Sequence, residues 1–239
     1  MSMSLEGRVI AIAGVAGGLG PVVAERLAAA GATVAGTDRD GARVAEVGDA
    51  LGLPSERWDG RAVDLLDEDE TRGWCAALLE RFGAVDGLVH LVGGWKGGQP
   101  LHEEPLADWD LLHDLLIRTL QHTTRAFHDA LSRSAHGRFV LVSARQAQAP
   151  SNDNAAYAAA KAAAEAWTLA LADGFSGGEA TANIIVVEAI LTARMRAESP
   201  DRDFASHTPA EHVAEAIAFL CSDAAVKMNG QRLPLTMRR

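Results

Sequence analysis

Residues 9–21 read VIAIAGVAGGLGP, and this stretch decides the fold. The five apolar residues that open it fit a strand buried on both faces. Glycines follow where a backbone must turn tightly or approach a phosphate closely, and Pro21 suits the first turn of a helix, where its missing N–H is not needed. A helix that starts after such a turn presents free amides and a favourable dipole to an anion. The stretch therefore predicts a strand, a glycine turn and a helix that together bind a pyrophosphate.

Strand-like and helix-like patterns alternate along the rest of the chain. Strands are expected at 8–13, 33–37, 61–63, 87–92, 138–143, 181–187 and 232–235. Helices are expected at 20–30, 43–51, 67–82, 105–131, 155–173 and 209–221. This alternation predicts an α/β fold of the Rossmann type, a doubly wound parallel sheet of about seven strands with helices on both faces.

Residues 1–239 are expected to form a single dinucleotide-binding and catalytic domain, because no linker-like segment or change of composition divides them. The weakest periodicity lies in residues 191–208, which are polar and contain Pro200. We interpret this segment as a mobile substrate loop, since irregular segments of this kind often cover a ligand.

Composition excludes several classes of partner. The formal net charge of -10 argues against nucleic acid, because such a partner needs a concentrated basic face. No apolar run reaches the length of a signal peptide or a membrane span, which predicts a cytoplasmic protein without membrane contacts. Cys75 and Cys221 form no CxxC motif and have no histidine cluster beside them, so no metal site is expected.

An acidic residue follows the glycine turn at the distance that a dinucleotide site requires. Asp38 ends the second expected strand, and its carboxylate can accept hydrogen bonds from both hydroxyls of an adenosine ribose while repelling a 2′-phosphate. Arg39 stands beside it, and a guanidinium there can engage a 2′-phosphate. We therefore expect NAD(H) to be the preferred cofactor, with NADP(H) as the alternative.

Tyr157 and Lys161 are spaced as an acid/base pair. Residues four apart share a helix face, so both groups are delivered to one point. A phenol is a poor proton donor or acceptor near neutrality, and an ammonium group beside it is expected to lower its pKa. The pair is therefore a candidate general acid/base.

In this order, the motifs resemble the short-chain dehydrogenase/reductase family over nearly the whole chain. The family's glycine motif and its Tyr-x-x-x-Lys motif match the residues described above. The resemblance implies an NAD(P)-dependent oxidoreductase with Tyr157 and Lys161 as catalytic residues. It further implies that the cofactor is held by Gly14, Gly17, Gly18, Leu19, Gly20, Asp38, Arg39, Asp64, Leu65, Gly93, Lys161 and Thr192.

Three positions depart from the family pattern. The family's catalytic serine falls on Ala144, its helix asparagine falls on Leu116, and its Asn-Asn-Ala-Gly motif becomes the stretch HLVG at residues 90–93. Loss of a serine hydroxyl that binds a carbonyl oxygen commonly costs orders of magnitude in rate. Ser143 is next to the vacant position, but adjacent residues of a strand face opposite sides.

One branch of the family lacks this serine as well. Residues 93–98, the alanine at position 144 and residues 203–209 resemble dihydropteridine reductase, whose quinonoid acceptor takes hydride readily. This local likeness predicts a planar conjugated acceptor, with Trp95, Ala144 and Gln146 as candidate substrate contacts. Trp95 either stacks on a flat ring or packs against the following loop.

Three functional hypotheses follow. The first is reduction of a planar conjugated acceptor, for which a quinonoid dihydropteridine is the candidate, with Tyr157 as proton donor. The second is a carbonyl or alcohol oxidoreductase in which Ser143, Gln146 or a water supplies the missing donor. The third is an NAD(H)-binding protein without catalysis. The family resemblance also implies a homodimer or homotetramer, paired through residues 105–131 and 155–173.

Overall fold

The computed structural model describes residues 3–236, and within them seven strands form one parallel sheet. The sheet order is β3-β2-β1-β4-β5-β6-β9, so the chain winds outward from β1 in both directions. The strands are β1 (Val9–Ala13), β2 (Thr33–Asp38), β3 (Trp58–Ala62), β4 (Gly87–His90), β5 (Arg138–Ala144), β6 (Thr181–Val187) and β9 (Arg232–Pro234). The predicted doubly wound Rossmann-type fold is confirmed.

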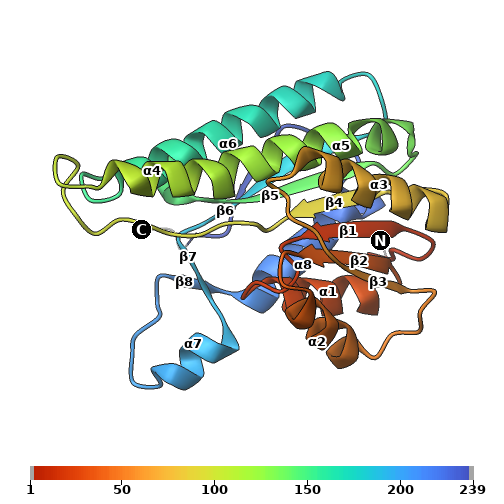
Figure 1. Ribbon diagram of the computed structural model, residues 1–239, viewed down its shortest axis with the longest axis horizontal. Helices are drawn as coiled ribbons and strands as arrows, with labels where there is room; N and C mark the ends of the chain where they lie inside the picture. Colours follow the sequence, from red (N-terminus) through yellow and green to blue (C-terminus); the bar gives the residue numbers. More distant parts are fainter. Residues whose placement is uncertain (1–2, 237–239) are drawn as a thin grey trace.

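Helices cover both faces of the sheet (Figure 1). One face carries α3 (Glu68–Phe82), α5 (Thr119–Arg133) and α6 (Ala155–Gly174), and the other carries α1 (Gly20–Ala29), α2 (Gly41–Leu51) and α8 (Ala210–Cys221). The core accordingly has two main layers. Ile10 and Ile12 of β1 belong to one layer, and Ala11 and Ala13 belong to the other. This alternation explains why β1 is apolar at every position.

The helix expected at 105–131 forms with an interruption. It consists of α4 (Leu106–His113), the π-helical turn η1 (Asp114–Arg118) and α5. A π turn adds one residue to a helical turn and changes which side chains face each neighbour. Leu116, at the family's asparagine position, is buried in a small apolar cluster that α4, η1 and α6 share.

The expected third strand was placed too late in the chain. The prediction covered 61–63, whereas β3 runs over Trp58–Ala62 and pairs with β2 so that Val34 lies beside Trp58. The first residues of the strand were missed because the strand is largely polar. Its buried Asp59 forms ion pairs with Arg61 at 2.6 Å and with Arg81 at 2.5 Å, so its burial depends on charges rather than on apolar alternation.

The segment expected as an irregular loop contains secondary structure. The short strands β7 (Ala189–Leu191) and β8 (His207–Pro209) pair in parallel, and α7 (Ala193–Glu198) lies between them. Figure 1 shows α7 standing away from the layers of the main body. The mobility of residues 191–208 stays a prediction. Among residues 3–236, no helix has the length and apolar character needed to cross a membrane.

Candidate active site

The glycine turn requires glycine for steric reasons. Gly14 has φ +85°, and a Cβ there would lie 3.0 Å from the amide nitrogen of Val92. A Cβ on Gly20 would lie 2.1 Å from the carbonyl oxygen of Val15, which no rearrangement of a side chain can relieve. The turn is fixed to β2, since the amides of Gly14 and Val15 donate to the carbonyl oxygen of Thr37 at 2.9 and 3.0 Å.

The N-terminus of α1 directs its amides toward this turn. Leu19 is the N-cap residue and makes no side-chain hydrogen bond to the helix, and Pro21 occupies the first turn. The amide of Gly20 donates to the carbonyl oxygen of Gly17 at 3.1 Å, and Pro21 has no N–H. Among the described residues, the amides of Gly18, Leu19 and Val22 have no backbone acceptor and are the ones left to bind an anion. Together with the positions that exclude a Cβ, this end of α1 fits the pyrophosphate of a dinucleotide.

The acidic end of β2 lies beside the same turn. Asp38 is half-buried and Arg39 is exposed. Asp40 caps α2 through hydrogen bonds from the amides of Ala42 and Arg43 at 3.1 and 3.2 Å. The guanidinium of Arg43 donates to the carbonyl oxygen of Ala16 and so braces the glycine turn. The sequence had indicated Asp38 and Arg39 but not Arg43.

Thr192 meets the glycine turn from the far end of the chain. Its hydroxyl accepts a hydrogen bond from the amide of Met195 at 3.3 Å and caps α7, and its methyl group would lie 3.4 Å from a Cβ on Gly18. Gly93 lies elsewhere in the site, where a Cβ would be 3.3 Å from Leu116. The structure thus brings Thr192 beside Gly18, and the binding of one cofactor by both residues stays a prediction.

Asp64 and Leu65 have other interactions. The carboxylate of exposed Asp64 accepts a hydrogen bond from the amide of Leu66 at 2.9 Å. The side chain of Leu65 is buried in the core, and its carbonyl oxygen is 2.9 Å from Nδ1 of His122. The side chain of Leu65 therefore packs in the core, and a cofactor contact there would have to use its backbone.

Tyr157 and Lys161 share a face of α6, as their spacing predicted. The ammonium nitrogen of Lys161 lies 6.0 Å from the centre of the Tyr157 ring and donates to the carbonyl oxygen of Val142 at 3.0 Å. Burial lowers the pKa of Lys161 to about 8, and the negative charge of Glu165 opposes that decrease. The side chain of Lys161 is thus poised to change charge near neutral pH.

The expected decrease in the pKa of Tyr157 is wrong for this structure. Burial raises the pKa of Tyr157 to about 12, because the half-buried phenolate would lose its hydration. Lys161 does not offset this cost, since its ammonium group is directed toward Val142. In this state Tyr157 is a protonated donor rather than a phenolate.

The position of the family's serine is apolar, and the neighbouring hydroxyl points elsewhere. Ala144 is buried, and Ser143 donates to Oε1 of Glu165 at 2.7 Å. The following 3₁₀ turn, η2 (Arg145–Ala147), packs on α6 and carries Gln146. The side-chain oxygen of Gln146 is buried, and no donor among the described residues reaches it.

Residues 93–105 reach the start of α6 beside Tyr157. The amide of Gly98 donates to the carbonyl oxygen of Asp153 at 2.7 Å, and Oε2 of Glu104 accepts from the amide of Ala156 at 3.1 Å. Trp95 in this segment is 61% exposed. Of its two interpretations, packing against the following loop is observed, since a Cβ on Gly97 or Gly98 would lie 3.2 or 3.7 Å from the ring. The rest of the ring surface is exposed, and stacking on a ligand stays a prediction.

His90 is a buried neutral histidine. Its Nε2 lies 3.3 Å from the hydroxyl of Thr119, and its Nδ1 lies 3.2 Å from the hydroxyl of Thr123. Burial, reinforced by the charge of Lys161, lowers the pKa of His90 to about 3. The histidine therefore contributes to packing and hydrogen bonding between β4 and α5. No cluster of three or more metal-ligating side chains occurs in residues 3–236.

Three residues of the site were missed at the level of sequence: Arg43, Glu104 and Glu165. Glu165 offered a signal, because it lies four positions after Lys161 and therefore on the same helix face. Glu104 offered none, since its contact with α6 depends on the path of residues 93–105.

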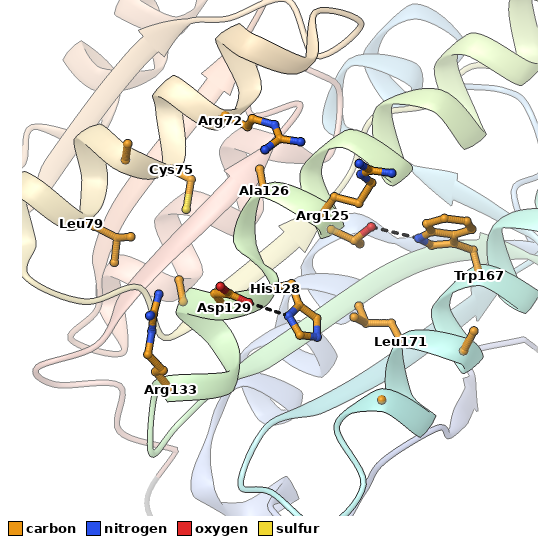
Figure 2. A pocket seen from close by; sticks show the side chains of 15 residues that line it. Arg72, Cys75, Leu79, Arg125, Ala126, His128, Asp129, Arg133, Trp167 and Leu171 are labelled. Carbon is orange, nitrogen blue, oxygen red and sulfur yellow. Dashed lines mark hydrogen bonds and ion pairs between the residues drawn. The ribbon is translucent and has the colours of Figure 1, made fainter.

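A hollow of the surface lies elsewhere, between α3, α5 and α6. Figure 2 shows its lining, a cavity of about 720 Å³ that includes Arg72, Arg125, Arg133 and Trp167. Trp167 of α6 donates through Nε1 to the hydroxyl of Thr124 of α5 at 2.9 Å and links the two helices. Neither Tyr157 nor Lys161 lines this hollow, so it is separate from the acid/base pair.

Fold and site define a dinucleotide-dependent oxidoreductase, and comparisons with known proteins give its family. Residues 14–236 match the family model described as Enoyl-(Acyl carrier protein) reductase. The chain is 26% identical to the 3-oxoacyl-[acyl-carrier-protein] reductase of Escherichia coli, over 97% of this chain and 96% of that protein. It belongs to the short-chain dehydrogenase/reductase family and is an NAD(P)-dependent oxidoreductase.

Solved structures agree with this assignment. A short-chain type dehydrogenase/reductase from Mycobacterium ulcerans superposes with a TM-score of 0.89 at 25% identity, covering 97% of this chain and 89% of that one. The 3-ketoacyl-(acyl-carrier-protein) reductase of Brucella melitensis, complexed with NADH, superposes with a TM-score of 0.84 at 27% identity, covering 97% of this chain and 98% of that one.

Proposed function

We propose that this oxidoreductase reduces a planar conjugated acceptor, with Tyr157 as the proton donor. The observation that carries the proposal is the buried methyl group of Ala144, at the position where a serine hydroxyl would bind a carbonyl oxygen. An electron-poor conjugated ring takes hydride without that hydrogen bond. A quinonoid dihydropteridine is the named candidate.

The residues of the site have separate roles in this reaction. NAD(P)H supplies the hydride when it is bound at the glycine turn. Tyr157 is protonated because burial raises its pKa to about 12, so it can donate a proton to the reduced acceptor. Lys161, one turn away, donates to the carbonyl oxygen of Val142 in this structure, and turning from that oxygen toward Tyr157 would bring its positive charge to the resulting phenolate. Trp95, with an exposed ring, can stack on a flat substrate.

We propose NADH as the preferred form of the cofactor. Asp38 at the end of β2 can accept hydrogen bonds from the ribose hydroxyls and repels a 2′-phosphate. A guanidinium beside Asp38 could attract the 2′-phosphate of NADPH. Arg39 is exposed to solvent and Arg43 is already bound to the glycine turn, so both should attract that phosphate only weakly.

A second candidate is reduction of a ketone. It is favoured by the relative named as a 3-oxoacyl-[acyl-carrier-protein] reductase, and by Gln146, whose amide lies on the turn that follows Ala144. A side-chain amide can supply the hydrogen bond that serine gives in other members of the family.

The experiment that tests the proposal is a substrate panel with purified protein and NADH. Quinonoid pterins, quinones, imines and ketones are compared, and the conjugated acceptors are expected to have the highest kcat/KM. Tyr157→Phe should lower kcat for the preferred acceptor by roughly 10²–10⁴-fold, since it removes the general acid. Unchanged turnover in this variant would show that Tyr157 is not the donor. Faster turnover of ketones would favour the second candidate.

We further propose a homodimer or homotetramer paired through α5 and α6. The hollow beside these helices and the half-exposed ring of Trp167 support an interface there (Figure 2). Light scattering of the protein and of Trp167→Glu tests it, because a charge at an interface should shift the population toward monomer.

A further inference from the structure

Glu165 is a buried carboxylate to which the proposed reaction assigns no role. Its side chain is 2% exposed, and it sits on α6 one helical turn beyond Lys161. A buried charge is costly unless it is paired and hydrogen-bonded. The groups that contact Glu165 should therefore indicate which role its negative charge has.

Three side chains from three elements donate to this carboxylate. Ser143 of β5 donates to Oε1 at 2.7 Å, and Nε of Arg232 on β9 donates to Oε2 at 2.6 Å. Gln148, directly after η2, reaches both oxygens at 3.4 and 3.2 Å. The carboxylate is thus held at a fixed point between β5, the turn after Ala144 and the last strand.

Glu165 and Lys161 are both buried and lie four residues apart on one face of α6. The charged and titratable groups around the ammonium group of Lys161 are Tyr157 and Glu165 on its own helix and His90 on β4. Its only hydrogen bond among the described residues goes to the neutral carbonyl oxygen of Val142. His90 is neutral near pH 7, because its pKa is lowered to about 3. Glu165 is therefore the anion that compensates the buried charge of Lys161.

We propose that Glu165 is a positioning residue of the active site, whose buried carboxylate keeps Lys161 in the ammonium form opposite Tyr157. This inference rests on the proposed function, because the ammonium form matters only if Tyr157 passes its proton to a substrate. Arg232 has the opposite effect, since its positive charge draws on the same carboxylate. Burial lowers the pKa of Lys161, and on this proposal Glu165 raises it to an extent that Arg232 limits.

These opposing effects predict shifts of opposite sign in two variants. Glu165→Gln retains the shape of the side chain and removes the negative charge, so the pKa of Lys161 should fall from about 8 by roughly one unit or more. Arg232→Gln frees the carboxylate to act on Lys161 alone, so the pKa of Lys161 should rise. Arg232 is 41% exposed, and its loss should leave the fold intact. Glu215→Gln, which breaks a surface ion pair with Arg26 on the other face of the sheet, is the matched control and should shift nothing.

The titration of the Lys161 amine is measured by NMR in the cofactor-free protein, with Lys161→Met to assign its signal. Shifts of opposite sign in Glu165→Gln and Arg232→Gln support the proposal. Equal shifts in both variants, or none, would overturn it, because a purely structural network would respond alike to the loss of either partner.

A second readout is the pH profile of kcat for the preferred acceptor. In Glu165→Gln the alkaline limb should move to lower pH by the same amount as the NMR titration, and in Arg232→Gln it should not. The NMR result does not depend on turnover. A failed substrate panel therefore tests the proposed function, while the titration tests the role of Glu165.

Discussion

The cofactor-facing and substrate-facing halves of the site are built by different means. The cofactor half consists of a glycine turn, a free helix N-terminus and Asp38, and its shape is set by backbone that a Cβ would obstruct. The substrate half consists of residues 93–105, η2 and Glu165, and side-chain hydrogen bonds from distant parts of the chain hold it together. The first half keeps the family pattern, and the second departs from it at Ala144 and Leu116.

The difference shows where an enzyme of this family can change. A backbone turn at Gly14 or Gly20 has one workable residue, so it persists. A side-chain network such as the one around Glu165 can exchange partners while the fold remains, which lets the chemistry of the acceptor vary.

The largest effect is expected in the backbone-built half. Gly20→Ala places a methyl group 2.1 Å from the carbonyl oxygen of Val15, and the unfolding free energy should fall by about 4 kcal/mol or more. Gly73→Ala in α3 is the control. No atom lies within 4 Å of its added Cβ, so it should gain up to about 1 kcal/mol from helix propensity. Urea unfolding measures both, and similar values for the two would contradict the steric argument.

The stability of the fold should depend on pH through His90, which is buried between β4 and α5. The pKa of buried His90 is lowered to about 3, so below pH 6.5 the unfolded chain takes up a proton that the folded chain refuses. The stability that this histidine contributes is complete above pH 6.5 and is lost as the pH falls toward 3. From pH 7 to pH 4 the unfolding free energy should drop by roughly 3 kcal/mol through this group.

Urea unfolding over this pH range, compared with His90→Asn, isolates the contribution of His90. The variant should show a flatter profile. His128→Asn, at an exposed position, serves as control and should follow the parent protein. If the unfolding free energy of the parent protein and of His90→Asn had the same pH dependence, the prediction would be wrong.

Cofactor preference is the next effect in size. Asp38→Ser removes the carboxylate that repels a 2′-phosphate, so the ratio of kcat/KM for NADPH over NADH should rise by about 10–100-fold. Asp64→Asn is the control, because its carboxylate holds the amide of Leu66 and should affect both cofactors alike. If Asp38→Ser left the ratio of kcat/KM for NADPH over NADH unchanged, residues other than Asp38 would determine the cofactor preference.

The smallest effect on turnover is expected at the serine position. It is tested with one variant on each face of β5, at Ala144 and at Ser143. Ala144→Ser restores a hydroxyl and should raise ketone turnover by about tenfold, less than a native hydroxyl contributes, because the surrounding side chains were not built around it. Ser143→Ala should change ketone turnover less than threefold or so, since that hydroxyl is already bound to Glu165. Loss of ketone turnover in Ser143→Ala would restore Ser143 as the missing donor.

Sequence patterns predicted the backbone-built parts well. The strand and turn at residues 9–21, the parallel order and the helix that carries Tyr157 follow from apolar runs, glycine and spacing, all of which are local. Strand β3 was misplaced because buried Asp59 depends on Arg81, which lies on α3. The pKa of Tyr157 was predicted in the wrong direction because spacing along a helix does not report burial.

The π turn η1 determines how α4 is oriented relative to α5. One residue corresponds to about 100° of rotation about a helix axis, so the turn rotates α4 relative to α5. Leu116 faces the apolar cluster beside α6, whereas Thr123 faces His90. Gain or loss of one residue at Asp114–Arg118 would therefore change the orientation of α4, while α5 would still pack on α3. Length variation at this joint would move α4 and the preceding residues 93–105, which contact the start of α6, while the sheet stays in place.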